Sequence, residues 1–110
     1  RVVDFAIDGF VYVLSSTGSI VKFSAGSTVD FTIVGLDTPL ANPSSIFATD
    51  ETNNIYILDN NRVVVLNKEG VYQSQYIFTE NFTKAIVLAD ENVKKIFLVS
   101  GSKIYSIDIK

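Results

Sequence analysis

Acidic side chains recur at similar positions along this 110-residue chain. Asp8, Asp50 and Asp90 each follow a short apolar run, and Glu51 and Glu91 come directly after two of them. Carboxylate oxygens are ligands that Ca²⁺ prefers, so acidic residues at equivalent turns could hold that ion or attract a cationic partner. Aspartate is also a common turn residue, because its carboxylate accepts hydrogen bonds from the nearby backbone. We favour the turn role and predict no metal site.

The residue types on which most enzymes depend are missing. The chain contains no histidine and no cysteine, which removes the commonest neutral-pH base, thiolate nucleophiles, disulfides and cysteine-based metal sites. Serines gather at two expected turns, but no histidine can activate them for nucleophilic attack. We therefore predict that the chain is not an enzyme, has no catalytic residue and binds no cofactor.

Charge and hydropathy narrow the range of partners. The net charge is −3, which argues against a protein that binds by neutralising phosphates, so no nucleic-acid partner is predicted. No apolar run approaches the roughly 20 residues of a membrane-spanning helix, so no direct membrane insertion is predicted. The chain begins with Arg1 and has no methionine, which indicates a longer parent protein. Its compartment stays unassigned, with the extracytoplasmic side slightly favoured.

The repeated aspartates mark an internal repeat, because Asp8, Asp50 and Asp90 lie 42 and 40 residues apart. A repeat of about 40–45 residues made of short strands is typical of a β-propeller blade. Residues 1–110 are predicted to form a single domain, in which blade 1 spans about 2–38, blade 2 about 43–80 and an incomplete blade 3 about 84–110.

Short apolar runs predict the strands within each repeat. The expected first strands are 2–7, 45–49 and 85–89; the second 10–14, 55–58 and 96–99; the third 20–23, 63–66 and 104–107; and the fourth 29–34 and 72–78. The third repeat ends without a fourth, outer strand. Asp8 and Gly9 between two apolar runs predict a two-residue hairpin turn.

The hydrophobic pattern of these strands decides the fold class. Residues 10–14, 55–58, 63–66 and 96–99 are apolar at consecutive positions, so both faces of their sheets need cover. The strands of a β-sandwich would alternate apolar and polar residues, and the tight turns exclude parallel strands. We predict an all-β fold, a partial β-propeller of three antiparallel blades whose last blade lacks its outer strand, with a β-sandwich as the alternative.

Three blades cannot close a ring, because propellers typically have about four to eight. The outer faces of the first and last repeats must therefore be covered by something else. We expect either a homo-oligomer, with a dimer favoured, or further blades of the parent protein.

The middle repeat carries a family resemblance. Its proline before the first strand, closing aspartate, Asn-x-Tyr entry to the second strand, Asp and Asn-Arg turn and later glycine resemble an NHL repeat. These positions are Pro43, Asp50, Asn54-Ile55-Tyr56, Asp59, Asn61-Arg62 and Gly70. The first repeat keeps Ile7-Asp8-Gly9 and Val11-Tyr12-Val13, and the third keeps Asp90 and the apolar strands.

The resemblance implies a relative of six-bladed propellers. Such proteins bind proteins, sugars or RNA, serve as sensor domains of membrane-anchored bacterial kinases, or act as lactonase-type hydrolases with a central metal ion. The RNA-binding members look basic on one face, unlike this chain, and the hydrolases look to need inward-facing Glu, Asn and Asp ligands that the first strands lack. The expected function is a non-catalytic interaction or assembly module that self-associates through exposed blades. The alternative is an extracytoplasmic sensor or ligand-binding domain of a membrane-anchored signalling protein.

Four residues are the candidates for partner contact. Tyr72 and Tyr76 lie at positions of equal parity on an outer strand, which predicts that they share a face. Ile104 and Ile107 lie on the last strand, whose unpaired edge is a template for pairing with another chain. The turn residues Asp59 and Arg62 are expected to brace their turn rather than to recognise a ligand.

Overall fold

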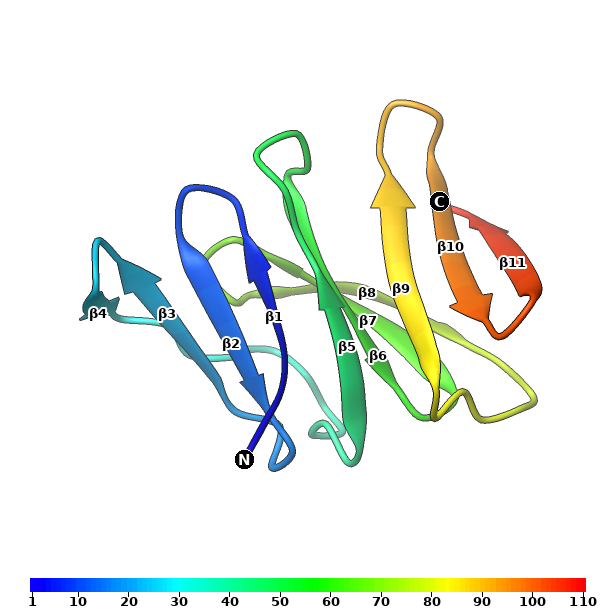
Figure 1. Ribbon diagram of the computed structural model, residues 1–110, viewed down its shortest axis with the longest axis horizontal. Coiled ribbons are helices and arrows are strands. Elements are labelled where there is room, and N and C mark those ends of the chain that lie inside the picture. The colour runs from blue at the N-terminus through cyan, green and yellow to red at the C-terminus, as the bar shows by residue number, and fades with distance from the viewer.

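The computed structural model describes all 110 residues and is all-β, with three antiparallel sheets of four, four and three strands (Figure 1). We call them sheets I, II and III. Sheet I contains β1 (Val2–Ile7), β2 (Val11–Ser15), β3 (Ile20–Ser24) and β4 (Ser27–Val29). Sheet II contains β5 (Pro43–Phe47), β6 (Asn54–Asp59), β7 (Arg62–Asn67) and β8 (Tyr72–Ile77). Sheet III contains β9 (Ala85–Asp90), β10 (Lys95–Ser100) and β11 (Lys103–Asp108). The chain has no helix long and apolar enough to cross a membrane.

The first strands of the three sheets lie together, and the sheets diverge from one another toward their outer strands. In each sheet the strands follow chain order, and β1, β5 and β9 lie side by side and run in the same direction (Figure 1). The close backbone approaches between sheets are those of β1 and β2 with β5, and of β5 and β6 with β9. The fold class is therefore the expected one, consistent with blades, and the two-layer β-sandwich is wrong.

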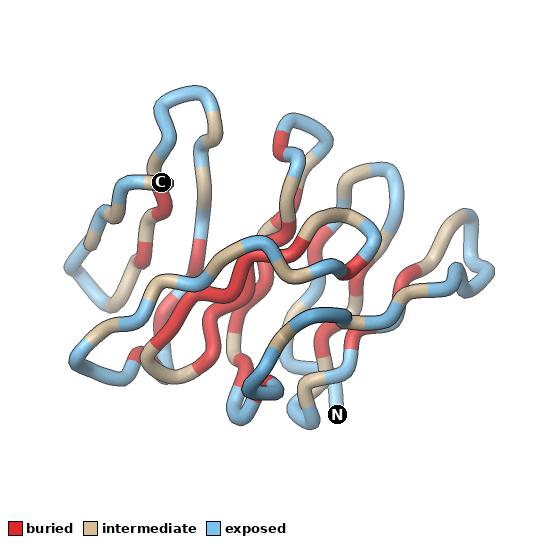
Figure 2. The backbone as a smooth tube through the Cα atoms, turned by 180° about the vertical axis from the view of Figure 1, so that it is seen from behind, coloured by how far each residue is buried: buried red, intermediate tan, exposed pale blue.

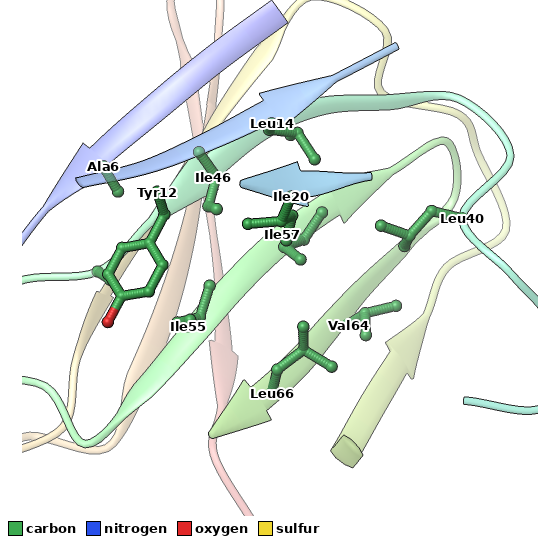
Figure 3. Packing of buried hydrophobic residues seen from close by; sticks show 11 residues of the cluster. Ala6, Tyr12, Leu14, Ile20, Leu40, Ile46, Ile55, Ile57, Val64 and Leu66 are labelled. Atoms are coloured by element: carbon green, nitrogen blue, oxygen red, sulfur yellow. The ribbon is translucent and has the colours of Figure 1, made fainter. Parts of the chain in front are cut away.

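Two hydrophobic clusters fill the spaces between the sheets. The first packs Tyr12 and Leu14 of sheet I against Ile55 and Ile57 of sheet II, all fully buried (Figure 3). The second packs sheet II against sheet III and contains nine buried residues. Sheet II is thus covered on both faces, which Figure 2 shows as the concentration of buried residues in its central strands. The consecutive apolar residues of β6 and β7 reflect this double burial.

The predicted fourth strand of the first repeat is wrong in position. Residues 29–34 were expected to pair within sheet I, but β4 is short and ends at Val29. The following segment leaves sheet I, and Val34 forms an isolated parallel bridge with Val71, the residue before β8. Its amide donates to the Gly70 carbonyl at 3.0 Å and its carbonyl accepts from the Tyr72 amide at 2.8 Å. The segment joins sheet II because these backbone groups find partners there.

The first hairpin turn is one residue longer than predicted. Ile7 pairs with Val11, so the loop contains Asp8, Gly9 and Phe10. The Asp8 carboxylate accepts a hydrogen bond from the Phe10 amide at 3.1 Å, which is the local turn contact expected of aspartate. The extra residue leaves the Asp8 side chain free to reach sheet II.

The expected bracing role of Asp59 and Arg62 is confirmed. Both residues are buried, and the Arg62 Nε donates to the Asp59 carboxylate at 3.0 Å. The carboxylate also accepts from the amide of Asn42 at 2.7 Å, and the guanidinium donates to the carbonyl of Thr38 at 2.8 Å. The pair therefore ties the connection between sheets I and II to the β6–β7 turn.

Candidate functional site

Sheet I leaves one apolar face open to solvent. Along each strand, the residues that point to this face alternate with the residues that are buried against sheet II. It consists of Phe5, Ile7, Val11, Val13, Val21 and Phe23, of which Phe5 and Ile7 are each 57% exposed and Val21 is 42% exposed. The strand register aligns Phe5 with Val13 and Val13 with Val21, so the apolar surface is continuous across the three strands.

Sheet III also leaves one apolar face open to solvent, on the side that points away from sheet II. Its apolar residues are Ile86, Leu88, Phe97, Val99 and Ile104, with Ser106 beside Phe97, and Ile104 is 69% exposed. Ile86, Val99 and Ile104 lie in one row across the sheet, because Val99 pairs with both of the others. At the far margin Lys95 forms an exposed ion pair with Asp108. Large contiguous apolar patches with polar margins mark interaction sites in soluble proteins.

Each open face has a covered counterpart within the chain. We call the side of a sheet that packs on the next sheet along the chain its forward face, and the other side its backward face. On the backward face of sheet II the row Ile46, Ile57 and Val64 packs against sheet I. The row Phe5, Val13 and Val21 is its counterpart in sheet I.

The same comparison applies at the other end. On the forward face of sheet II, Leu58 and Val63 are buried against sheet III. Their counterparts on sheet III are Val99 and Ile104. The open faces are therefore the backward face of sheet I and the forward face of sheet III.

The two covered interfaces share a specific hydrogen bond near the inner strands. The Asp4 carboxylate accepts from the Ile46 amide at 2.8 Å, and the Ser45 hydroxyl accepts from the Val87 amide at 3.1 Å. Donor and acceptor lie 42 residues apart in both cases, so the contact follows the repeat. At the third equivalent position stands Ile86, which has no hydrogen-bonding side chain.

A polar cluster closes one end of the interface between sheets I and II. The Asp8 carboxylate accepts a hydrogen bond from the Tyr12 hydroxyl at 3.1 Å and forms an ion pair with Lys68 of the β7–β8 turn. Beside it, buried Lys22 donates to the Lys68 carbonyl at 2.9 Å, and its ammonium lies 4.3 Å from the centre of the Phe10 ring. Burial alone would raise the pKa of the Asp8 carboxyl, but the Lys68 charge and the hydrogen bonds outweigh it and hold that pKa below 3.8.

An equivalent cluster lies between sheets II and III. The Tyr56 hydroxyl donates to the Glu91 carboxylate at 2.7 Å, and the amides of Asn53 and Asn54 donate to the same group at 2.6 and 3.2 Å. Burial, followed by the carboxylate, raises the pKa of Tyr56, so the hydroxyl remains a donor. At the next equivalent position Phe97 has no hydroxyl. The forward face of sheet III therefore lacks the hydrogen-bonding side chains that stand at these two positions in sheets I and II, and its polar residues are Ser106, Lys95 and Asp108 instead.

The Asp8 contact predicts a specific loss of stability in acid. Because folding lowers the pKa of this carboxyl, the unfolded chain binds the proton more readily, so stabilisation is complete above pH 3.8 and is lost as the pH falls through the lowered value. Urea unfolding of the native chain and of Asp8→Asn should show a lower midpoint for the variant at about pH 6 and a gap between the two midpoints that narrows as the pH falls below 3.8. Asp50→Asn, at an exposed equivalent turn, is the control and should follow the native profile. A midpoint gap that does not narrow in acid would contradict the role of Asp8.

The prediction that Tyr72 and Tyr76 share a face is wrong. A bulge in β8 inserts Gln73, so Tyr72 pairs with Leu66 whereas Tyr76 pairs with Val63. Tyr72 therefore packs on the cluster between sheets I and II, and Tyr76 packs on the cluster between sheets II and III. Strict period-two counting fails here because a bulge reverses the side on which every later residue lies.

Ile104 and Ile107 also lie on opposite faces of their strand. Ile104 belongs to the forward face of sheet III, whereas Ile107 packs toward sheet II with the second cluster. β11 is an edge strand, as the missing outer strand predicted. Of the four predicted contact residues, Ile104 lies on an open apolar face.

The acidic turn residues do not converge. Asp8 and Glu91 are engaged in separate contacts between sheets, and Asp90 accepts from the amides of Asn92 and Val93 in its own turn. No group of three or more acidic side chains is placed to hold a metal ion.

Comparison with protein-family models finds no match for this chain, and comparison with curated proteins finds none either. The open faces are therefore interpreted from their own geometry. Sequence reasoning named Ile104 for its place on an edge strand and did not name Phe5, Val21 or Ile86. The sequence carries no signal that sets them apart, because an apolar strand residue shows the same pattern whether its face is covered or open.

Proposed function

We propose that this chain is a non-catalytic assembly module that self-associates through the backward face of sheet I and the forward face of sheet III. The carrying observation is that both faces are the apolar counterparts of surfaces that are fully buried inside the chain. At about 25 cal/mol per Å² of apolar surface, covering them yields a large favourable free energy. Covering a face with another sheet repeats a contact that the chain already makes twice.

The proposal includes the identity of the sheets as blades of an NHL-like propeller. Its support is the order of strands within each sheet, the side-by-side first strands and the contacts that recur every 42 residues. Such blades bury both faces against their neighbours, and an open blade face is a contact surface. The wedge-like spread of the sheets is what blades around an axis require.

Thiol labelling can test this proposal. Because the chain contains no cysteine, a thiol reagent reacts only with a cysteine that is introduced by substitution. Ile104→Cys places a thiol on the forward face of sheet III, and Ile77→Cys places one on β8, outside both open faces. The two native side chains are similarly exposed, at 69% and 67%. Maleimide labelling of Ile104→Cys should slow as the protein concentration rises, whereas labelling of Ile77→Cys should not change. Equal rates at all concentrations would contradict self-association through this face.

A further inference from the structure

The contact between sheets is directional and is made twice in the same way. The forward face of sheet I packs on the backward face of sheet II, and the forward face of sheet II packs on the backward face of sheet III. One face of each kind remains open, the backward face of sheet I and the forward face of sheet III. A second copy of the chain carries both missing partners.

The shape of the chain favours a closed contact over a straight stack. The backbones of neighbouring sheets approach one another through the first strands β1, β5 and β9 and the strands next to them. The sheets therefore spread apart toward their outer strands, as Figure 1 shows. If further sheets pack by the same contact, each one is rotated in the same sense about an axis that lies beside the first strands.

We infer that two copies of this chain close head to tail into a ring of six sheets, each copy's sheet III packing on the partner's sheet I. This inference rests on the proposed self-association. Closed propellers have about four to eight blades, so two copies of three sheets fall inside this range and three copies fall outside it. Contact between unlike faces gives a ring when the rotation closes and an open filament when it does not.

Closure also leaves no apolar face in water. An open chain of copies always leaves one backward face and one forward face exposed at its ends. The closed pair covers all four faces, while the loss of translational and rotational freedom is that of a single association. The second contact within the pair is therefore intramolecular and strongly favoured.

The open forward face is more apolar than its covered counterparts at two positions. Ile86 replaces the hydrogen-bonding residues Asp4 and Ser45, and Phe97 replaces Tyr12 and Tyr56. A phenyl ring and an isoleucine gain from contact with the apolar row of sheet I, but Ile86 offers no acceptor to the Phe5 amide, the counterpart of the Ile46 and Val87 amides. The closing contact therefore depends on apolar packing and lacks the hydrogen bond that the two contacts within the chain share.

The test introduces opposite charges on the two faces, Val21→Glu on sheet I and Ile104→Lys on sheet III. Sedimentation equilibrium of the native chain should give twice the 12.1 kDa chain mass. Each single variant should dissociate, with the dimer weakened roughly 30-fold or more, because every closing contact then buries an unpaired charge. A 1:1 mixture of the two variants should regain the two-copy mass, since one contact keeps both native faces and the other joins opposite charges.

Three results would overturn head-to-tail closure while leaving self-association intact. A single variant that stays dimeric would show contact between like faces. A mass that grows beyond two copies with concentration would show an open chain of copies. A mixture of the two variants that stays monomeric would show that the two altered faces do not meet. A monomeric native chain at micromolar concentration would overturn both the ring and the proposed function. Ile77→Lys, at an exposed position outside both faces, is the matched control and should keep the native mass. Circular dichroism of each variant checks that it folds.

Discussion

Asp59→Ala is expected to lower the free energy of unfolding by about 3–5 kcal/mol, because it breaks a buried ion pair by removing one partner. Asp59 is 2% exposed and Arg62 is 8% exposed, so the guanidinium loses its buried counter-charge and keeps only the neutral acceptors of Thr38, Pro39 and Gln75. The amides of Ala41 and Asn42 lose their acceptor at the same time. Urea unfolding at a fixed protein concentration measures the loss.

Two further variants separate the pair from a general effect of charge. Arg62→Met combined with Asp59→Ala should recover part of the loss, since a buried pair replaced by apolar side chains leaves no uncompensated charge. Asp108→Ala removes one partner of the exposed Lys95 pair and should leave the unfolding midpoint unchanged. Additive effects of the Asp59 and Arg62 substitutions would show that the two side chains do not act as a unit.

Much of the fold was readable from the sequence because local signals agreed with one another. The Asp-centred spacing predicted three repeats, and the consecutive apolar residues of β6 and β7 predicted sheets covered on both faces. Residues 55–58 and 63–66 are buried as this pattern requires. Three segments with similar strand patterns were each expected to form one antiparallel sheet, and each of them does.

The errors arise where a single inserted residue or a distant partner decides the outcome. The bulge at Gln73 sends Tyr72 and Tyr76 to opposite faces, and no local pattern distinguishes it from regular alternation. Val34 pairs with Val71, 37 positions along the chain, so its strand propensity was satisfied in sheet II rather than in sheet I. Propensity predicts that a segment is extended, but its partner is set by tertiary packing.

The candidate site was only partly predictable for a related reason. The sequence pattern of an apolar strand is the same whether the strand is buried by its own chain or by another chain. Phe5, Val21 and Ile86 are identified as open only when the position of each sheet in the array is known. The polar contacts of Glu91 with Tyr56 were likewise hidden, because the two residues lie in different repeats.

Gly70→Ala is expected to destabilise the chain by about 2–5 kcal/mol through two effects, backbone strain and a steric clash. Gly70 has a φ of +94°, and a Cβ there would lie 2.4 Å from the carbonyl oxygen of Thr32, in the segment that docks on β8. The backbone of that segment must move, which breaks the bridge between Val34 and Val71. Gly26→Ala is the matched control, because its φ is +84° but no atom lies within 4 Å of the added Cβ, so it should cost only the strain of about 1–2 kcal/mol. Urea midpoints of the two variants at one protein concentration measure the difference, and equal losses would mean that the Thr32 segment does not approach Gly70 as closely as the fold requires.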